Sequence, residues 1–221
     1  GRRHLKAITE VAQAGLAAIV DTDPRVERLA ADMGVPFFSE AGAMLSRRPP
    51  DGVIVGTPTE CHFQPVLDSL QAGAHVLVEK PITTTMDEAR TVIEMSERCS
   101  RHVLVGHHRR YYETVHKARE LVQGGAIGQL LGVCGQWTAK KAEAYFEPGW
   151  RRQRASGPVM TNLIHELDTL RYVCGEIESL IARTGRGIRG HAKEETAAIL
   201  LNFESGAVGT FLLSDAASSP W

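Results

Sequence analysis

The first half of the chain alternates short apolar runs with segments of helical period. The apolar runs are four or five residues long and almost free of charge, which is typical of buried strands. They cover residues 16–20, 35–38, 52–55, 74–78 and 102–105. Between them, apolar positions recur every three or four residues, which predicts helices over 2–14, 24–33, 39–45, 59–72 and 86–99.

Strands that are apolar on both faces belong to sheets that helices cover on both sides. Short links and right-handed crossovers then predict a doubly wound parallel sheet. Within this half, Thr85 is expected to cap the helix over 86–99, and Ser39 and Thr59 the helices that follow them.

The pattern changes after Gly106. A helix over 112–123 and a strand over 130–138 precede a polar, aromatic segment at 140–157 that has no period. A helix over 159–174 and strands over 177–184, 196–203 and 208–214 follow. The tight link at 204–207 predicts a hairpin, and therefore a mixed or antiparallel sheet. The pattern predicts a doubly wound domain at 1–106 and a second domain with a mixed or antiparallel sheet at 107–221.

Composition, net charge and cysteine spacing limit the classes of protein to which this chain can belong. The 221 residues are 43% hydrophobic and 23% charged, with a net charge of −1, so nothing favours binding to nucleic acid or to an anionic membrane. No apolar run has transmembrane length. The four widely spaced cysteines indicate reduced, buried thiols of a cytoplasmic protein. Helical sequence directly after Gly1 and an uncovered strand near the end suggest that the first strand and the C-terminal part of the second domain are missing.

The most informative strand, 74–78, ends on Glu79-Lys80-Pro81. A lysine at the carboxyl end of a parallel strand lies where open α/β sheets bind ligands. Pro81 ends the strand and is a candidate for a cis peptide bond. The alternative is a strand-end lysine with a solvated head group.

Asp21 ends the second apolar segment about 20 residues after Gly1, which is the spacing of a ribose-binding acid in a dinucleotide fold. Such a carboxylate favours NAD over NADP. It could instead cap the helix that starts at Pro24, a role that Asp23 fills better. Gly1 is the only candidate glycine of a phosphate-binding turn.

Gly56-Thr57-Pro58 follows another strand and leads into a helix, which suits a dinucleotide lying over the strand ends. A plain loop with Thr59 as N-cap is the alternative. His62, one turn into that helix, is expected at the helix surface rather than in catalysis.

His165 lies among polar residues on the helix over 159–174. Thr161, Asn162 and Asp168 fall four before, three before and three after it, so a regular helix places them on one face. Histidine is well matched to proton transfer near neutral pH, and a neighbouring acid or amide can fix its tautomer. A structural histidine is the alternative.

Two basic segments complete the candidates. His107-His108-Arg109-Arg110 follows a strand at the domain junction, and Trp150-Arg151-Arg152 lies in the aperiodic segment. Adjacent histidines alternate faces on an extended chain and no acid or cysteine lies at ligand spacing, so we expect no metal. The arginines could bind an anionic or diol substrate, or pair with surface acids.

Taken together, these motifs resemble the Gfo/Idh/MocA oxidoreductases over essentially the whole chain. The motifs are Asp21-Thr22-Asp23-Pro24, Gly56-Thr57-Pro58, Glu79-Lys80-Pro81, Gly106-His107-His108-Arg109-Arg110 and Asn162-x-x-His165-x-x-Asp168. The resemblance implies hydride transfer between NAD(P), with NAD favoured, and a secondary alcohol of a sugar, cyclitol or related compound. It also implies a Rossmann domain at 1–106, a C-terminal α/β domain with an open, mostly antiparallel sheet at 107–221, and a homodimer or homotetramer through that sheet.

The resemblance assigns roles to single residues. Lys80 matches the lysine beside the substrate hydroxyl and His165 the general acid/base, and we expect the two to meet at one cleft. The implied substrate-binding residues are Asn162, Thr161, Trp150, Arg151 and His108. The implied cofactor-binding residues are Gly1, Asp21, Gly56, Thr57, Pro58, His62, Glu79, Lys80 and Arg109.

The chain departs from the family pattern at one residue, and two alternative functions stay open. Many relatives carry Asp where this chain has Thr161, which leaves open how Lys80 and His165 divide the proton chemistry. The alternatives are a non-catalytic NAD-binding regulator and an NAD-assisted glycosidase or lyase. Steady NADH production from a polyol would separate the dehydrogenase from both.

Overall fold

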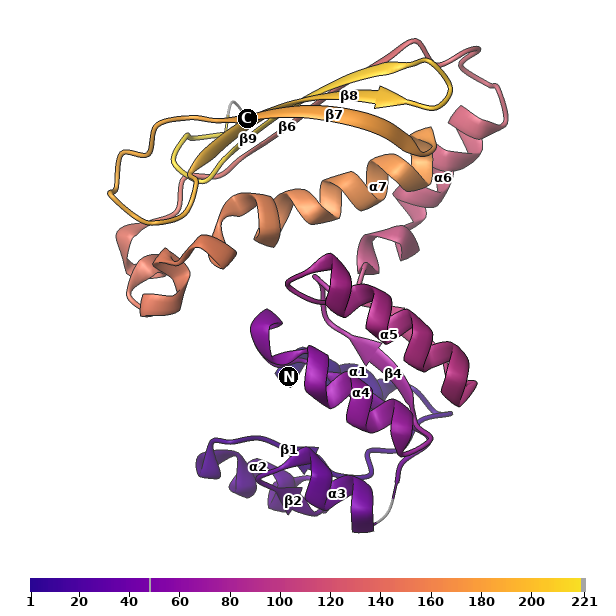
Figure 1. Ribbon diagram of the computed structural model, residues 1–221, viewed down its shortest axis with the longest axis vertical. Helices are drawn as coiled ribbons and strands as arrows, with labels where there is room; N and C mark the ends of the chain where they lie inside the picture. The colour runs from indigo at the N-terminus through magenta and orange to yellow at the C-terminus, as the bar shows by residue number, and fades with distance from the viewer. Residues whose placement is uncertain (48, 220–221) are drawn as a thin grey trace. The chain divides into compact units, whose positions relative to one another are not determined.

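A computed structural model describes residues 1–47 and 49–219 (Figure 1). The chain divides into two compact units, Gly1–Gly106 and His107–Trp221. The division falls at the change of sequence pattern after Gly106. Each unit is described below by itself.

All the strand pairs of the first unit are parallel. Strands β1 and β2 pair with each other, and β4 lies between β3 and β5. The strands are β1 (Ile19–Val20), β2 (Phe37–Phe38), β3 (Gly52–Val55), β4 (His75–Val78) and β5 (Val103–Val105). The register of the larger set aligns Val55 with Val78 and Val78 with Val105, so these three strands end together.

Helices connect these strands in strict alternation. They are α1 (Arg2–Glu10), α2 (Glu27–Asp32), α3 (Ala41–Arg47), α4 (Phe63–Gln71) and α5 (Met86–Cys99), with 3₁₀ turns η1 (Pro24–Val26) and η2 (Thr59–Cys61). Thr85 caps α5 as predicted, in a reciprocal capping box with Glu88. Thr59, in contrast, is the first residue of η2 and not a cap, because the chain enters α4 through a 3₁₀ turn.

The core of the first unit lies between the three-stranded set and two helices. Val55, Val76 and Val78 pack against Val66 and Leu70 of α4 and against Val92 of α5. The opposite side is open: Leu104 is 60% exposed and Ile54 is also exposed. The predicted parallel sheet with helical links is confirmed. Its described strands form two separately bonded sets, and α4 and α5 pack on one face of the larger set.

The second unit is a four-stranded mixed sheet with helices on one face (Figure 1). Its strands are β6 (Gly132–Thr138), β7 (Ile177–Thr184), β8 (Thr196–Phe203) and β9 (Val208–Ser214). Strand order is β6-β9-β8-β7; β9 pairs in parallel with β6, and the other two pairings are antiparallel. The hairpin between β8 and β9 confirms the prediction at 204–207.

Helix α7 (Ile164–Cys174) lies along the inner face of this sheet. Leu167 and Leu170 of α7 pack against inward residues of β8 and β9, among them Leu201, Phe203 and Leu213. Helix α6 (Glu113–Gln123) packs against α7. The rest is built from short turns: η3 (His108–Tyr111), η4 (Glu143–Phe146), η5 (Gly149–Arg152), η6 (Arg154–Ser156) and the π-helical η7 (Val159–Leu163).

Two further predictions can be compared with the structure. All four cysteines are free, but Cys61 and Cys134 are exposed, so the expectation of buried thiols is wrong for these two. Cys134 lies on the outer side of β6, where a strand residue faces away from the core. No helix of the described part of the chain is long and apolar enough to cross a membrane.

Candidate functional site

Lys80 lies directly beyond the strand ladder of the first unit. The backbone N–H of Glu79 still donates to the Val55 carbonyl oxygen, at 2.9 Å, and Lys80 is the next residue. The Lys80–Pro81 peptide bond is cis, and Pro81 was a candidate for such a bond from the sequence. Lys80 is half-buried. The structure thus places the lysine at the carboxyl ends of β3 and β4, where open α/β sheets bind ligands.

The Glu79 carboxylate is held by groups of its own unit. Its Oε1 lies 2.8 Å from His4 Nε2, and its Oε2 accepts from the Lys80 backbone N–H at 3.3 Å. Burial raises the pKa of Glu79, but the bond to His4 and the nearby positive charges outweigh it and leave the pKa below its ordinary value. Gly106 lies against the same carboxylate, and a Cβ there would come within 3.3 Å of Oε2. Glu79 is therefore an ionised, positioned group beside Lys80.

Two glycines predicted to bind the cofactor lie close together. A Cβ at Gly56 would come within 3.7 Å of the Gly1 nitrogen and 3.9 Å of the His4 ring. Gly1, which precedes the first turn of α1, therefore lies beside the turn that follows β3. Gly56, Thr57 and Pro58 are all exposed. Unbonded N–H groups at a helix start beside an open turn fit the phosphates of a dinucleotide.

Asp21 is exposed directly after β1. Its Oδ1 accepts from the Asp23 N–H at 2.9 Å, while Asp23 caps η1 through the N–H of Arg25. The capping role therefore belongs to Asp23, as the sequence favoured, and Asp21 presents a carboxylate of the kind that binds ribose hydroxyls.

His62 is not a helix surface residue, as the spacing had predicted. It is 1% exposed, because η2 turns the chain before α4 begins and brings the ring inward. Its Nδ1 lies 2.8 Å from the Pro81 carbonyl oxygen and its Nε2 lies 2.9 Å from the Thr57 carbonyl oxygen. The ring contacts both turns that carry predicted site residues.

In the second unit, the helical segment with His165 begins with a π-helical turn. Residues Val159–Leu163 form this turn and α7 starts at Ile164, so the prediction of one regular helix over 159–174 is wrong at its start. The wider turn shifts Thr161 and Asn162 around the axis relative to α-helical spacing. Thr161 Oγ1 lies 2.9 Å from the Gly157 carbonyl oxygen and 3.0 Å from Asn162 Oδ1, and either oxygen can accept its single hydroxyl proton.

A distant carboxylate holds the beginning of that segment. Glu194 Oε1 accepts from the Val159 N–H at 2.9 Å. Gly157 is buried under Glu194, and a Cβ there would collide with the carboxylate oxygens. A carboxylate at a helix N-terminus satisfies unbonded N–H groups and complements the helix dipole.

Two imidazole rings lie against His165, which is 8% exposed. The His108 ring centroid lies 5.1 Å from that of His165, and the His107 centroid lies 6.3 Å away, both edge-to-face. The premise that adjacent histidines alternate faces is wrong here, because His108–Tyr111 is a 3₁₀ turn and not an extended chain. Within the described residues, no group of three or more His, Cys, Asp or Glu side chains is arranged to hold a metal ion.

Acids of α7 engage the two arginines after these histidines. Arg110 forms a bidentate pair with Asp168, with Nε to Oδ2 at 2.8 Å and Nη2 to Oδ1 at 2.6 Å. Arg109 pairs with Glu166. The bonds that Arg110 donates to Asp168 raise the pKa of its guanidinium above the ordinary value. Asp168 also lies 3.8 Å from His107 Nδ1, so it joins the arginine and histidine of one loop to α7.

Trp150 and Arg151 lie on η5. Trp150 is exposed, and the Arg151 guanidinium lies over the rings of Tyr145 and Trp150 while Nη1 donates to the Tyr145 carbonyl oxygen at 2.8 Å. The segment that appeared aperiodic is therefore ordered by cation–π contacts and carbonyl bonds.

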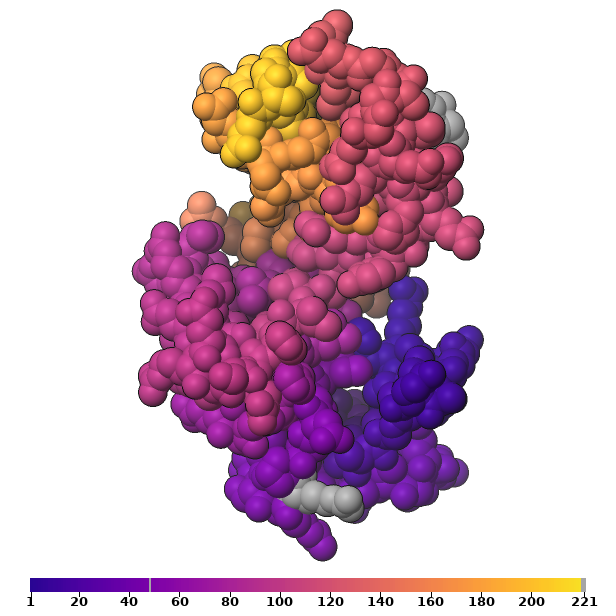
Figure 2. Space-filling view, turned by 90° about the vertical axis from the view of Figure 1, so that its right-hand side faces the viewer, coloured from indigo at the N-terminus to yellow at the C-terminus, as the bar shows by residue number. Residues whose placement is uncertain are grey.

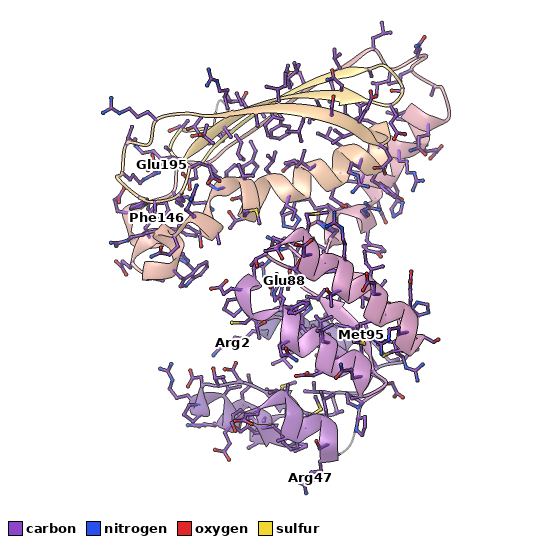
Figure 3. The ribbon with its side chains drawn as sticks, viewed as in Figure 1. Arg2, Arg47, Glu88, Met95, Phe146 and Glu195 are labelled. Carbon is purple, nitrogen blue, oxygen red and sulfur yellow. The ribbon has the colours of Figure 1, made fainter. Side chains whose placement is uncertain are left out.

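A buried charge cluster lies at one end of the second unit, where Figure 3 shows Glu195 near Phe146. Lys193 Nζ lies 2.5 Å from Asp215 Oδ2, and Arg189 Nη1 lies 3.3 Å from Asp215 Oδ1. The Glu195 carboxylate accepts from the N–H groups of Ile188 and Arg189. Burial raises the pKa of Glu195, but these bonds and the charges of Arg189 and Lys193 leave it below its ordinary value.

Sequence reasoning missed three residues that hold these sites: His4, Glu194 and Glu166. Each acts on a residue far away in the chain, as His4 does on Glu79 and Glu194 on Val159. The only signal for Glu166 was its place next to His165. Gly157 was a signal for close approach, but it did not identify Glu194 as the neighbour.

Comparisons with known proteins cover both units. Residues 1–107 match the family model described as "Oxidoreductase family, NAD-binding Rossmann fold", and residues 115–221 match the GFO/IDH/MocA C-terminal domain. Inositol 2-dehydrogenase of Leifsonia xyli is 30% identical over 179 residues, which are 79% of this chain and 50% of that protein. The 2,7-anhydro-N-acetylneuraminate hydratase of Escherichia coli is 26% identical over 83% of this chain and 51% of that protein.

Solved structures share the fold. The WlbA dehydrogenase from Chromobacterium violaceum, in complex with NADH and UDP-GlcNAcA, superposes with a TM-score of 0.91 at 24% identity, over 99% of this chain and 65% of that one. This chain spans about half the length of the curated relatives it matches. Two models of one family together match nearly every residue, and the chain therefore belongs to the Gfo/Idh/MocA oxidoreductases.

Proposed function

We propose that this chain is part of an enzyme that transfers a hydride between NAD and a secondary alcohol of a sugar, cyclitol or related hydroxy compound. The observation that carries the proposal is the position of Lys80, one residue beyond the paired ends of β3 and β4 in an NAD-binding Rossmann unit. A related protein is an inositol 2-dehydrogenase, which supports the substrate class.

Lys80 and His165 carry the proton chemistry in this proposal. When an alcohol is oxidised, its hydroxyl proton must leave while negative charge develops on the oxygen. The Lys80 ammonium stabilises that charge and the His165 imidazole takes the proton. NAD, when bound, supplies the hydride acceptor. Glu79, Arg109 and His62 stay in the proposal on the cofactor side. Glu79 does so through its place next to Lys80, and His62 through its contact with the Thr57 turn.

The residues that would hold NAD lie on the first unit. Gly1 and the turn Gly56-Thr57-Pro58 would bind the phosphates through backbone N–H groups, and Asp21 would bind the ribose hydroxyls. An exposed carboxylate also repels a 2′-phosphate, so we expect preference for NAD. In full-length protein, Asp21→Ala should lower the ratio of NAD to NADP efficiency about tenfold. An unchanged ratio would remove Asp21 from the cofactor site.

Substrate contacts are assigned to the second unit. Asn162 and Thr161 lie in the π-helical turn before His165, and His108 lies against the His165 ring. Trp150 and Arg151 form an exposed aromatic and cationic pair on η5. Amide, hydroxyl and guanidinium groups of this kind bind the hydroxyls of a polyol, and these five residues are the proposed substrate-binding set.

We also propose that the outer face of the β6–β9 sheet joins two copies of the chain in a homodimer or homotetramer. Leu200, Leu212, Val208 and Ile181 are exposed large hydrophobic residues on these strands. The yellow C-terminal strands also reach the surface in Figure 2. An exposed apolar face of this extent indicates an interaction surface. Leu200→Arg should lower the mass measured by analytical ultracentrifugation, and an unchanged mass would contradict this assembly.

The four free cysteines support the cytoplasm as the proposed compartment.

A redox-neutral reaction is the second candidate, because one relative is a hydratase. Such a reaction would use the same lysine and histidine but return the hydride to the product. It would form product without net NADH.

The test is a screen of sugars, inositols and hydroxy acids with full-length protein, following NADH absorbance and substrate loss together. The proposal predicts equal amounts of NADH and product with at least one polyol. Product without NADH would establish the redox-neutral candidate, and NAD binding with no product from any compound would favour a non-catalytic regulator.

A further inference from the structure

His62 occupies the space under two turns that follow neighbouring strands. The Thr57 turn follows β3 and the Pro81 turn follows β4, and the ring lies between their carbonyl oxygens. The side chain is 1% exposed, so no solvent competes for either ring nitrogen. The ring thus connects two backbone segments that are 24 residues apart in the chain.

Both contacts are made to groups that can only accept a hydrogen bond. A neutral imidazole carries one N–H and donates to one carbonyl, whereas the doubly protonated ring donates to both. Whichever ring nitrogen donates, its bond is worth more than an exposed one, because losing it would leave a buried polar group unsatisfied. The ring has a fixed length, so it also sets the separation of the two carbonyl oxygens.

These carbonyls belong to the two turns on which the proposed reaction depends. Thr57 is part of the turn proposed to bind the dinucleotide, and Pro81 directly follows Lys80. Thr83 Oγ1 donates to the Thr85 carbonyl oxygen at 2.9 Å, which fixes the far end of the lysine turn to the start of α5. His62 contacts the beginning of the same turn, at the Pro81 carbonyl oxygen.

We propose that His62 is a positioning residue that holds the Lys80 turn at a fixed distance from the cofactor turn. The inference rests on the proposed dehydrogenase function and adds to it the group that aligns cofactor and lysine. His62 touches neither substrate nor cofactor in this role. It acts through the backbone, and a misplacement of about 1 Å at a reacting group can reduce turnover about a hundredfold.

Two amide substitutions separate the two bonds. The amide nitrogen of Asn takes a place close to Nδ1, and that of Gln a place close to Nε2. His62→Asn therefore keeps an N–H donor facing the Pro81 carbonyl oxygen and removes the group facing Thr57, and His62→Gln does the reverse. His62→Phe keeps the ring volume and removes both ring nitrogens. Gln64→Ala, two residues further along and exposed, is the matched control.

A positioning role predicts that the two amides act on different kinetic parameters. His62→Gln should lower kcat about tenfold to a hundredfold with KM for NAD nearly unchanged, and His62→Asn should raise KM for NAD about tenfold with kcat largely kept. His62→Phe should show both defects, and Gln64→Ala neither. A merely structural histidine would give the same defect in both amides.

The proposal is overturned if His62→Phe keeps both parameters, or if the Asn and Gln variants change the same parameter to the same extent. A measurement on the unmodified protein covers the case in which the variants do not fold. Nitrogen-15 NMR of the His62 ring should show an N–H proton protected from exchange with water. Exchange at the rate of an exposed ring would overturn the proposal. Absence of turnover in the unmodified protein would count against the dehydrogenase assignment alone, since the NMR result does not depend on it.

Discussion

The two units hold their candidate catalytic side chains by different interactions. In the first unit, backbone groups surround Lys80: a strand ladder, the Glu79 N–H and a turn whose carbonyl contacts His62. In the second, charged side chains hold the segments that carry His165 and its neighbouring rings: Arg110 pairs with Asp168, Arg109 with Glu166, and Glu194 bonds to the start of the helical segment. Backbone bonds respond little to pH, whereas ion pairs respond to both pH and salt. The stability of the second unit should therefore depend more strongly on pH and salt than that of the first.

The largest expected effect is loss of turnover in Lys80→Ala. Removing the ammonium should lower kcat about 10²- to 10⁴-fold while KM for NAD changes little. Stability should stay within about 0.5 kcal/mol, because Lys80 lies beyond the ladder that holds its strand. Steady-state kinetics and urea unfolding measure the two effects. Lys117→Ala, which removes an exposed lysine that pairs with Glu120, is the control. Full activity of Lys80→Ala would show that Lys80 only ends a strand.

Arg110→Ala tests the ion pairs of the second unit. It leaves Asp168, which is 8% exposed, without its bidentate partner. We expect a loss of about 1–3 kcal/mol in the free energy of unfolding, below the value for a fully buried pair because Arg110 itself is 38% exposed. Arg171→Ala breaks the exposed pair with Glu176 and should cost at most about 1 kcal/mol. Equal losses in the two variants would contradict the role given to Asp168.

Gly157→Ala tests the start of the segment that carries His165. The added methyl group collides with Glu194, whose carboxylate must move away from the Val159 N–H. We expect a loss of about 1–2 kcal/mol in the free energy of unfolding, the sum of a lost cap and local repacking. Gly149→Ala has open space around its Cβ and should have little effect. Thermal unfolding that does not distinguish the two variants would remove Glu194 from the account.

The smallest expected effect is a change in how the free energy of unfolding depends on pH. The pKa of Glu195 is lower in the folded chain than in the unfolded chain, so this carboxylate contributes stability above its unfolded pKa of about 4.3. That contribution is lost as pH falls through the lower, folded value. Glu195→Gln should flatten the fall in stability below about pH 4.3, measured by urea unfolding across pH 3–7. Glu204→Gln, on the exposed hairpin, should keep the original slope, and equal slopes in both would contradict the prediction.

Much of the fold could be predicted because its signals are local. The strands Ile177–Thr184, Thr196–Phe203 and Val208–Ser214 follow their apolar patterns, and Thr85 begins α5 with its capping box. The same holds for Lys80, since a strand followed by Glu-Lys-Pro is a local pattern.

The remaining features depend on contacts between distant residues. The π-helical turn at Val159–Leu163 is held by Glu194, and nothing in its local sequence marks it. His62 has the spacing of a surface residue, yet a 3₁₀ turn brings it inside. His107 and His108 contact the His165 ring because residues 108–111 also coil into a 3₁₀ turn. Such turns depend on their tertiary surroundings more than on propensity.

A double-mutant cycle tests the central claim, that Lys80 and His165 act in one chemical step, most directly. Turnover of a polyol by full-length protein is measured for Lys80→Ala, for His165→Ala and for the double variant. Residues that act as a unit give losses that are far from additive, so the double variant should be about as slow as the slower single variant. Losses that multiply, with each single change reducing kcat independently of the other, would contradict the account.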